Sequence, residues 1–178
     1  MRRLMMMAGA LGVALLMGTG AFAQVPPDPN NPNEAVPDKY VYTPYGENIK
    51  LDMAKKVADA AMAEATKRGW PMCITVVDTS GELVFFEKMD ECQYASIVIS
   101  QNKARAAARF RRPTLVFERL MGKGQFFAYL PTLGDAFIGS RGGNPLVVGG
   151  KIVGAIGVSG GTGSQDDTIS QAGAKAVQ

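Results

Sequence analysis

The stretch GGKIVGAIGVSGGTGSQDD, residues Gly149–Asp167, decides most of what the sequence indicates about the fold. Ile152–Val158 is an apolar run, and Pro145–Val148 is a shorter apolar run that precedes it. Two such runs around Gly149–Lys151 predict a β-hairpin. A closing helix is expected to follow, with Ser164 as its N-cap and carboxylates in its first turn.

The segment GVSGG inside this stretch allows three interpretations. As a G-x-S-x-G nucleophile elbow it would need a base beside Ser159, and the usual base, histidine, is absent from the chain. As a phosphate loop it lacks the Lys-Ser/Thr pair, because Gly163 is followed by Ser-Gln. The remaining interpretation is packing. Gly154 and Gly157 then predict close approach of a helix, a ligand or another subunit.

The rest of the chain alternates helix and strand patterns, with Gly69 ending the first helix. The predicted elements are a helix capped by Asn48 and running to Arg68, a hairpin of 72–78 and 83–89, a helix over 94–110, and a third helix capped by Thr114. We therefore expect an α/β (α+β) domain. Its sheet is expected to be antiparallel, with about five strands built from two hairpins, and to be flanked by helices.

Residues 1–23 are typical of a secretory signal peptide. Arg2 and Arg3 precede the apolar run Leu4–Met17, and Ala21–Ala23 supplies a small-x-small cleavage site. A retained membrane helix is the alternative, but the run is shorter than the roughly 20 apolar residues that a bilayer needs. We expect cleavage after Ala23, a periplasmic or secreted protein, and no stable membrane insertion after cleavage.

The charge balance excludes some partners. The chain has a net charge of +3, and removal of the two arginines of the signal peptide lowers it to +1. No global basicity is left to recruit nucleic acid or a membrane surface, so neither is an expected partner.

Residues 24–46 hold six of the ten prolines and form an arm or linker before the domain over 47–178. Proline at this density excludes helix and central strand. A spacer and an arm lying over a neighbouring subunit both remain open. Tyr40, Tyr42 and Tyr45 favour docking, because aromatic rings with polar tips are common at contacts.

Cys73 and Cys92 allow either a disulfide or two unpaired thiols. A zinc site is not expected, since histidine and Cys-x-x-Cys spacing are both missing. Among the basic residues, Arg105, Arg109 and Arg112 share one helical face. That face is either a solvated or subunit-facing stripe, or a site for a ligand bearing carboxylates.

Three segments together resemble the GlcG/HbpS-type haem-binding family, also called haem-degrading or DUF336 domains and related to the C-terminal domains of PduO-type proteins. They are VVDTSGELVFFEKMD, QNKARAAARFRRPT and GGNPLVVGGKIVGAIGVSGGTGSQDD. The resemblance extends from about Asn48 to the C-terminus. It departs at Asp90-Glu91-Cys92, where the family commonly has Asp-Gly-Ala.

The resemblance implies a compact α/β domain with profilin-like layering that assembles into a homo-oligomer, and a haem or related tetrapyrrole ligand. The leading hypothesis is an exported oligomeric haem-binding protein, active in haem sensing, storage or breakdown, with no catalytic residue assigned. One alternative is an enzyme that degrades haem with peroxide. Another is a non-catalytic interaction subunit of an exported system that engages its partner through the arm.

The resemblance supplies no axial ligand, so candidates rest on chemistry. Haem iron accepts histidine, cysteine, methionine or tyrosine, and histidine is excluded. The candidate cofactor-binding residues gather around the second helix. Met89, Cys92 and Tyr94 are candidate ligands, and Lys103, Arg109 and Arg112 are candidate partners of the propionates.

Overall fold

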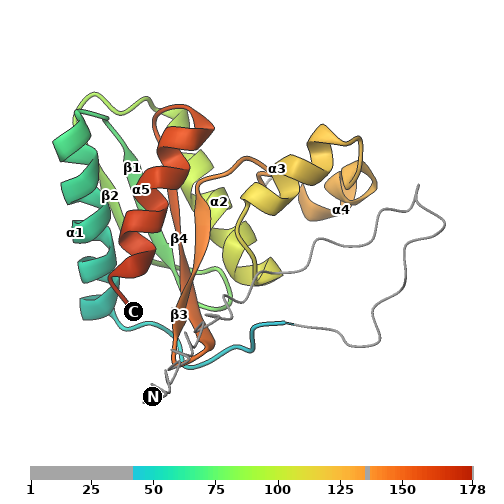
Figure 1. Cartoon of the computed structure of the whole chain (residues 1–178), viewed down its shortest axis with the longest axis horizontal. Helices are drawn as coiled ribbons and strands as arrows, with labels where there is room; N and C mark the ends of the chain where they lie inside the picture. The colour runs from blue at the N-terminus through green and yellow to red at the C-terminus, as the bar shows by residue number, and fades with distance from the viewer. Residues whose placement is uncertain (1–41, 135–136, 178) are drawn as a thin grey trace, which may run out of the picture.

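A computed structural model describes residues 42–134 and 137–177 (Figure 1). The predicted signal peptide and the arm up to residue 41 lie outside the described residues. The sheet is antiparallel, with strand order β2-β1-β4-β3. Its strands are β1 (Cys73–Val77), β2 (Leu83–Lys88), β3 (Gly143–Val148) and β4 (Lys151–Ser159). The α+β class and both hairpins are confirmed, with four strands in the described part of the chain instead of about five.

Helices cover both faces of the sheet (Figure 1). Helices α1 (Leu51–Arg68) and α5 (Gly163–Lys175) pack together on one face, and α2 (Ala95–Phe110) packs on the other. A lobe of α3 (Leu115–Gly122), η1 (Phe127–Tyr129) and α4 (Leu130–Leu133) projects to the side. Aromatic rings hold this lobe together, with Phe117 4.9 Å from Phe110 and 5.1 Å from Phe137 between ring centroids.

The two faces of the sheet are packed differently. Large aliphatic side chains such as Val57, Ile156 and Ile169 fill the space under α1 and α5. Alanines such as Ala104 and Ala107 line the contact with α2. Small side chains let a helix approach a sheet closely, so α2 lies tight against β4 while α1 and α5 bury the larger hydrophobic core.

Gly157 of β4 allows this close approach of α2, and Gly154 allows a close approach to the backbone of β1. A Cβ on Gly157 would overlap the carbonyl oxygen of Ser100 in α2, and a Cβ on Gly154 would overlap the carbonyl oxygen of Val77. The packing interpretation of the opening stretch is confirmed. The nucleophile interpretation fails further, because Ser159 is buried and its hydroxyl donates to Ser96 Oγ at 3.0 Å.

The β3–β4 turn consists of Gly149 and Gly150, whose φ angles are +56° and +75°. Left-handed conformation at both turn residues is the geometry of a two-residue type I′ hairpin, which glycine adopts without steric penalty.

Two predicted helix caps are wrong. Helix α1 begins after Lys50, and the side chain of Asn48 instead donates to Asp78 and accepts from Thr79 N, which fixes the turn after β1. The predicted stop at Gly69 is confirmed, with Gly69 in the left-handed conformation.

Helix α5 is capped by Thr162, two residues before the predicted Ser164. Thr162 accepts from Gln165 N, and the Gln165 side chain accepts from Thr162 N at 2.8 Å. This reciprocal pair is a capping box. The sequence contains the S/T-x-x-E/Q pattern that is typical of this motif.

The end of the proline-rich arm docks on its own chain. Tyr45 forms a parallel bridge with Ile152, and Gly46 N donates to Ile152 O at 2.7 Å. The Tyr45 hydroxyl donates to the carbonyl oxygen of Ala108 at 2.9 Å, at the C-terminal end of α2. The arm therefore reaches the domain between the β3–β4 hairpin and α2.

Trp70, the single tryptophan, follows directly after the C-cap of α1. The Arg68 guanidinium lies 4.9 Å from the centroid of the Trp70 ring, and the ring packs against the larger core.

Across the described ranges, no helix has the length and apolar character that crossing a membrane requires.

Candidate functional site

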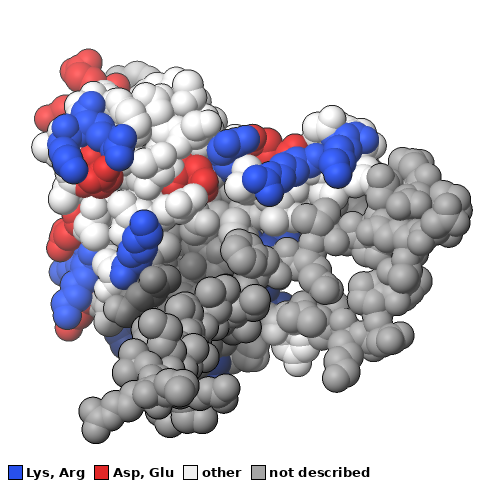
Figure 2. Space-filling model, viewed as in Figure 1, with Lys and Arg blue, Asp and Glu red and all other residues white. Residues whose placement is uncertain are grey.

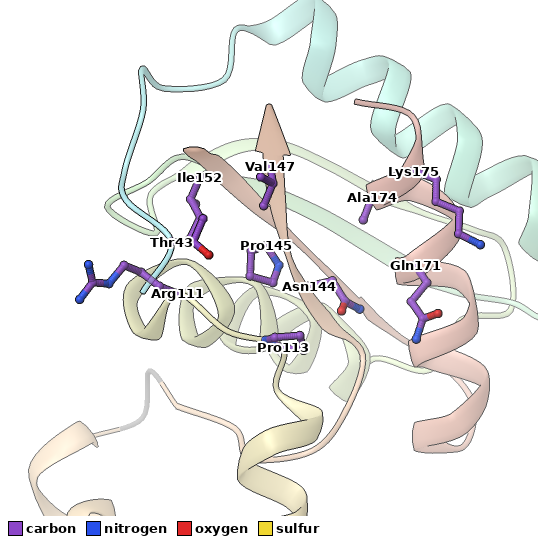
Figure 3. Close-up of a pocket in the computed structure, with 10 residues that line it drawn as sticks. All are labelled: Thr43, Arg111, Pro113, Asn144, Pro145, Val147, Ile152, Gln171, Ala174 and Lys175. Carbon is purple, nitrogen blue, oxygen red and sulfur yellow. The ribbon is translucent and has the colours of Figure 1, made fainter. Parts of the chain in front are cut away.

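A pocket of about 360 Å³ lies between the β3–β4 hairpin, the C-terminal half of α5 and the segment joining α2 to α3 (Figure 3). Ten residues line it: Thr43, Arg111, Pro113, Asn144, Pro145, Val147, Ile152, Gln171, Ala174 and Lys175. This volume lies within the range of small-molecule sites.

The floor of the pocket is apolar because of how β3 is placed. Strand β3 is at the edge of the sheet, where Pro145 is tolerated although it cannot donate a backbone hydrogen bond. Val147 lies two residues further and faces the same side, and Pro113 and Ala174 add apolar walls. The floor can therefore hold a flat hydrophobic ligand.

Two cationic side chains lie at the ends of the pocket, with Pro145 and Val147 between them, and their charged groups point outward from it (Figure 3). Lys175 is in the last turn of α5. Arg111 is the C-cap of α2 in a left-handed conformation with φ 55°, and its guanidinium lies 4.5 Å from the centroid of the Tyr42 ring. The docked arm thus fixes the position of Arg111, since guanidinium groups stack favourably on aromatic rings.

The remaining wall is a hydrogen-bonded polar cluster. Asn144 Nδ2 donates to Asp167 Oδ1 at 3.1 Å and to Ser170 Oγ at 2.6 Å. Gln171 Nε2 donates to Asp167 Oδ2 at 2.7 Å. Both carboxylate oxygens of Asp167 are engaged, so this wall is rigid and presents amide groups to a ligand.

These features together suit an amphiphilic anion. A planar apolar body would lie on the floor, and carboxylates would pair with the cations at either end. A second hollow, of about 610 Å³, lies between α3 and the residues that follow α4, and Met121, Leu130 and Phe137 are among its lining residues.

The structure does not bring the six predicted cofactor-binding residues together. Met89, Cys92 and Tyr94 lie around the start of α2, whereas Arg109 and Arg112 lie at its other end. The axial distance from Tyr94 to Arg109 is about 22 Å at 1.5 Å per residue. One ligand therefore cannot use both groups in the way the sequence-based hypothesis requires.

The three candidate ligands also differ in exposure. Tyr94 is 87% exposed, whereas Cys92 is buried against Cys73. The Met89 sulfur accepts a hydrogen bond from Met72 N at 3.4 Å. Of these three residues, only Tyr94 is exposed, while Met89 is half-buried.

Lys103 is in the interior, not at a ligand-facing surface. Its side chain is 2% exposed, and Nζ lies 2.6 Å from Asp166 Oδ2 and 3.2 Å from Val158 O. Burial raises the pKa of Asp166, against the opposing effects of Lys103 and of the Gly161 amide. Pairing with a propionate would require Lys103 to leave Asp166 unpaired, so the structure assigns it a structural role.

The arginine stripe is mostly engaged within the chain. Arg109 donates to Ser80 O at 2.7 Å and pairs with Glu82 at 3.1 Å. Arg105 donates to Gly81 O at 3.3 Å, and Arg112 donates to Phe110 O at 3.1 Å. Arg105 and Arg109 thus hold the β1–β2 turn against α2, which accounts for the periodicity that the sequence shows.

The pocket cations Arg111 and Lys175 are absent from the sequence-based site. Arg111 falls outside the i, i+4, i+7 spacing that defines the arginine stripe, and Lys175 is more than 60 residues away in sequence. The sequence signal available for Arg111 is its position directly after a predicted helix. No sequence pattern indicates that Lys175 shares its pocket.

Charge elsewhere on the described surface is mixed. Acidic and basic side chains are interspersed over α1, while Lys and Arg follow one edge of the α3 lobe (Figure 2). Within 42–134 and 137–177, no cluster of three or more acidic or cysteine side chains could hold a metal ion.

Comparison with known proteins identifies the family. A family model described as haem degrading protein HbpS-like matches residues 49–175. The chain belongs to this family. Protein GlcG of Escherichia coli strain K12 is 41% identical over 112 residues, which is 62% of this chain and 81% of GlcG.

Solved structures show the same fold. A double-mutant form of HbpS from Streptomyces reticuli superposes with a TM-score of 0.67 at 26% identity, over 82% of this chain and 99% of HbpS. A PduOC–haem complex has a TM-score of 0.69 at 22% identity, over 74% of this chain and 96% of PduOC. At that identity the PduOC likeness concerns the fold alone.

Proposed function

We propose that this protein binds haem or a related tetrapyrrole, and that it does so as an exported homo-oligomer. Membership of the HbpS-like haem-degrading family supports the ligand class. The observation that carries the choice of site is the pocket beside β3, an apolar floor with Arg111 at one end and Lys175 at the other.

The residues present fit a haem by their chemistry. Pro145, Val147 and Ala174 would contact the macrocycle, and Arg111 and Lys175 would pair with the two propionates. Tyrosine is an accepted haem ligand, and Tyr42 lies beside the pocket, stacked under Arg111. We therefore propose Tyr42 as the iron ligand.

A hemin titration of the full chain tests this site. We expect a saturable Soret change for wild type and about tenfold weaker binding for Arg111→Ala, which corresponds to one charge-assisted pair. Tyr42→Phe should alter the Soret position, whereas Tyr94→Phe, at the far end of α2, is the matched control and should not. Unchanged titrations for both Arg111→Ala and Tyr42→Phe would place the ligand elsewhere.

Degradation of the bound haem is a second candidate function, favoured by the description of the matching family. Peroxide added to the loaded protein should then bleach the Soret band and release iron. A loaded protein whose spectrum persists under peroxide is a binding protein only.

Exposed apolar side chains support the oligomer. Tyr94 and Val98 lie one turn apart on α2, and Val98 is 59% exposed. Large exposed hydrophobic residues at this spacing are typical of helix faces that pack on a partner. Light scattering measures the assembly, and the mass of protein recovered from the exported fraction tests cleavage after Ala23.

A further inference from the structure

Two buried thiols meet at the end of the sheet opposite the pocket. Cys73 is the first residue of β1, and Cys92 lies in the turn before α2, 19 positions later. Their sulfur atoms are 2.8 Å apart, and both side chains are buried. Neither belongs to the proposed haem site.

The surroundings hold both thiols in this orientation. Cys73 sits in the ladder, paired with Lys88 of β2 and with Ser159 of β4. Cys92 N donates to Met89 O at 3.2 Å, and its sulfur contacts the carbonyl oxygen of Ser159 at 3.7 Å. A cystine needs sulfurs about 2.05 Å apart, so a movement of under about 1 Å closes the bond.

We propose that Cys73 and Cys92 form a structural disulfide that ties β1 to the start of α2. The oxidant is a reactive disulfide, carried either by a protein or by a small thiol. One cysteine thiolate attacks it to give a mixed disulfide and release one thiol of the oxidant. The second thiolate then displaces the other thiol, so two protons and two electrons leave the cysteine pair and the oxidant becomes its dithiol form.

The timing of oxidation follows from burial. Burial, with the hydrogen bond to Cys92, raises the pKa of the Cys73 thiol to about 12. Because the thiolate is the attacking species, the folded reduced protein should react slowly. The bond then forms while the chain folds, before β1 is covered by β2 and β4, and afterwards the same burial protects it from reductants.

Refolding of the full chain with oxidised glutathione as the oxidant tests the proposal. The denatured product should show no free thiol before reduction and both cysteines after it, with a mass increase of about 2 Da for the added hydrogens. Protein refolded with reductant in place of oxidised glutathione should have a Tm lower by about 10 °C, as expected for a chain without this loop. The readout is thiol content, so it does not depend on haem binding.

Cys92→Ala is the control variant for effects of the reductant itself. Its Tm should be the same with and without reductant. Two free thiols in wild type after oxidative refolding, or glutathione retained on one of them, would overturn the proposal. That thiol count is read on wild type, so the test stands even if the variant folds poorly.

Discussion

Glu91 occupies a left-handed backbone conformation, with φ 62°, in the turn that leads into Cys92. Residues with a Cβ adopt this conformation at a cost of roughly 1–2 kcal/mol, which glycine avoids. We expect Glu91→Gly to raise the free energy of unfolding by about 1 kcal/mol, as measured by urea denaturation. Asp90→Gly, at a neighbour without positive φ, is the control and should not stabilise.

The opposite change is expected at Gly157. Gly157→Ala would push a methyl group into the backbone of α2 at Ser100 and Ala104, so we expect a loss of about 3 kcal/mol of stability. Gly122, at the end of α3, has no atom within 4 Å of an added Cβ. Gly122→Ala should be neutral or slightly stabilising in the same denaturation series. Equal losses at both positions would contradict the packing role of Gly157.

At the level of secondary structure, the sequence predicts the bodies of the hairpins and long helices, but it does not predict where two of the helices begin. The hairpins and the body of each long helix follow from local periodicity and are confirmed. Asn48 and Ser164 are both good cap residues, but the first is used by the turn after β1, and the second lies inside a helix already capped by Thr162. Competition among neighbouring cap residues is decided by tertiary contacts.

This assignment of the α5 cap is directly testable. Thr162→Ala should cost about 1 kcal/mol of stability, because one half of the capping box is lost. Ser164→Ala should change the free energy of unfolding by only a few tenths of a kcal/mol. Thermal or urea unfolding of the two variants side by side measures the difference, and a larger effect at Ser164 would refute the assignment.

Helix α3 is attached to the domain through an ion pair. Arg141 Nε donates to Glu118 Oε1 at 2.6 Å, and the Arg141 backbone amide donates to Oε2 at 2.8 Å. The pairing lowers the pKa of Glu118. A carboxylate with a lowered folded-state pKa stabilises the fold above its unfolded pKa of about 4.5, and this stabilisation is lost as the pH falls through the folded value.

Glu118→Gln should therefore lose about 1 kcal/mol at pH 7 and nothing at pH values below the folded pKa, where wild type is also neutral. Urea denaturation across this pH range measures it. Glu64→Gln removes the pair with Arg68 within α1, which also lowers the pKa of Glu64, and it should give a smaller loss with the same pH dependence. A penalty for Glu118→Gln that persists in acid would show that charge is not its cause.

For the whole molecule, the buried pair of Lys103 and Asp166 connects the two helical layers. Lys103 belongs to α2 on one face of the sheet and Asp166 to α5 on the other, and they meet near the C-terminal end of β4, at Val158. Lys103→Met leaves a buried carboxylate without its partner and should cost about 3–5 kcal/mol. Lys103→Met combined with Asp166→Leu should recover most of that loss in equilibrium unfolding. A double variant as unstable as the single one would argue against pairing as the main contribution of Lys103.

The candidate site shows why function was harder to predict than fold. Lys103 and the arginine stripe are noticeable in the sequence because they are cations on a helix, yet the fold uses them for internal contacts. The pocket instead draws on residues from the arm, β3, β4, the α2–α3 link and α5. Local pattern identifies elements, but which elements share a cavity depends on the order of strands and on the docking of the arm.

Trp70 gives the protein a built-in optical reporter. It is the single indole of the chain, it rests under Arg68, and it lies three positions before Cys73. Its emission can follow unfolding without any attached dye, and quenching of that emission on hemin addition gives a second signal beside the Soret band. A neighbouring disulfide also quenches tryptophan fluorescence. The emission of Trp70 can therefore report both the redox state of the two thiols and the binding of haem.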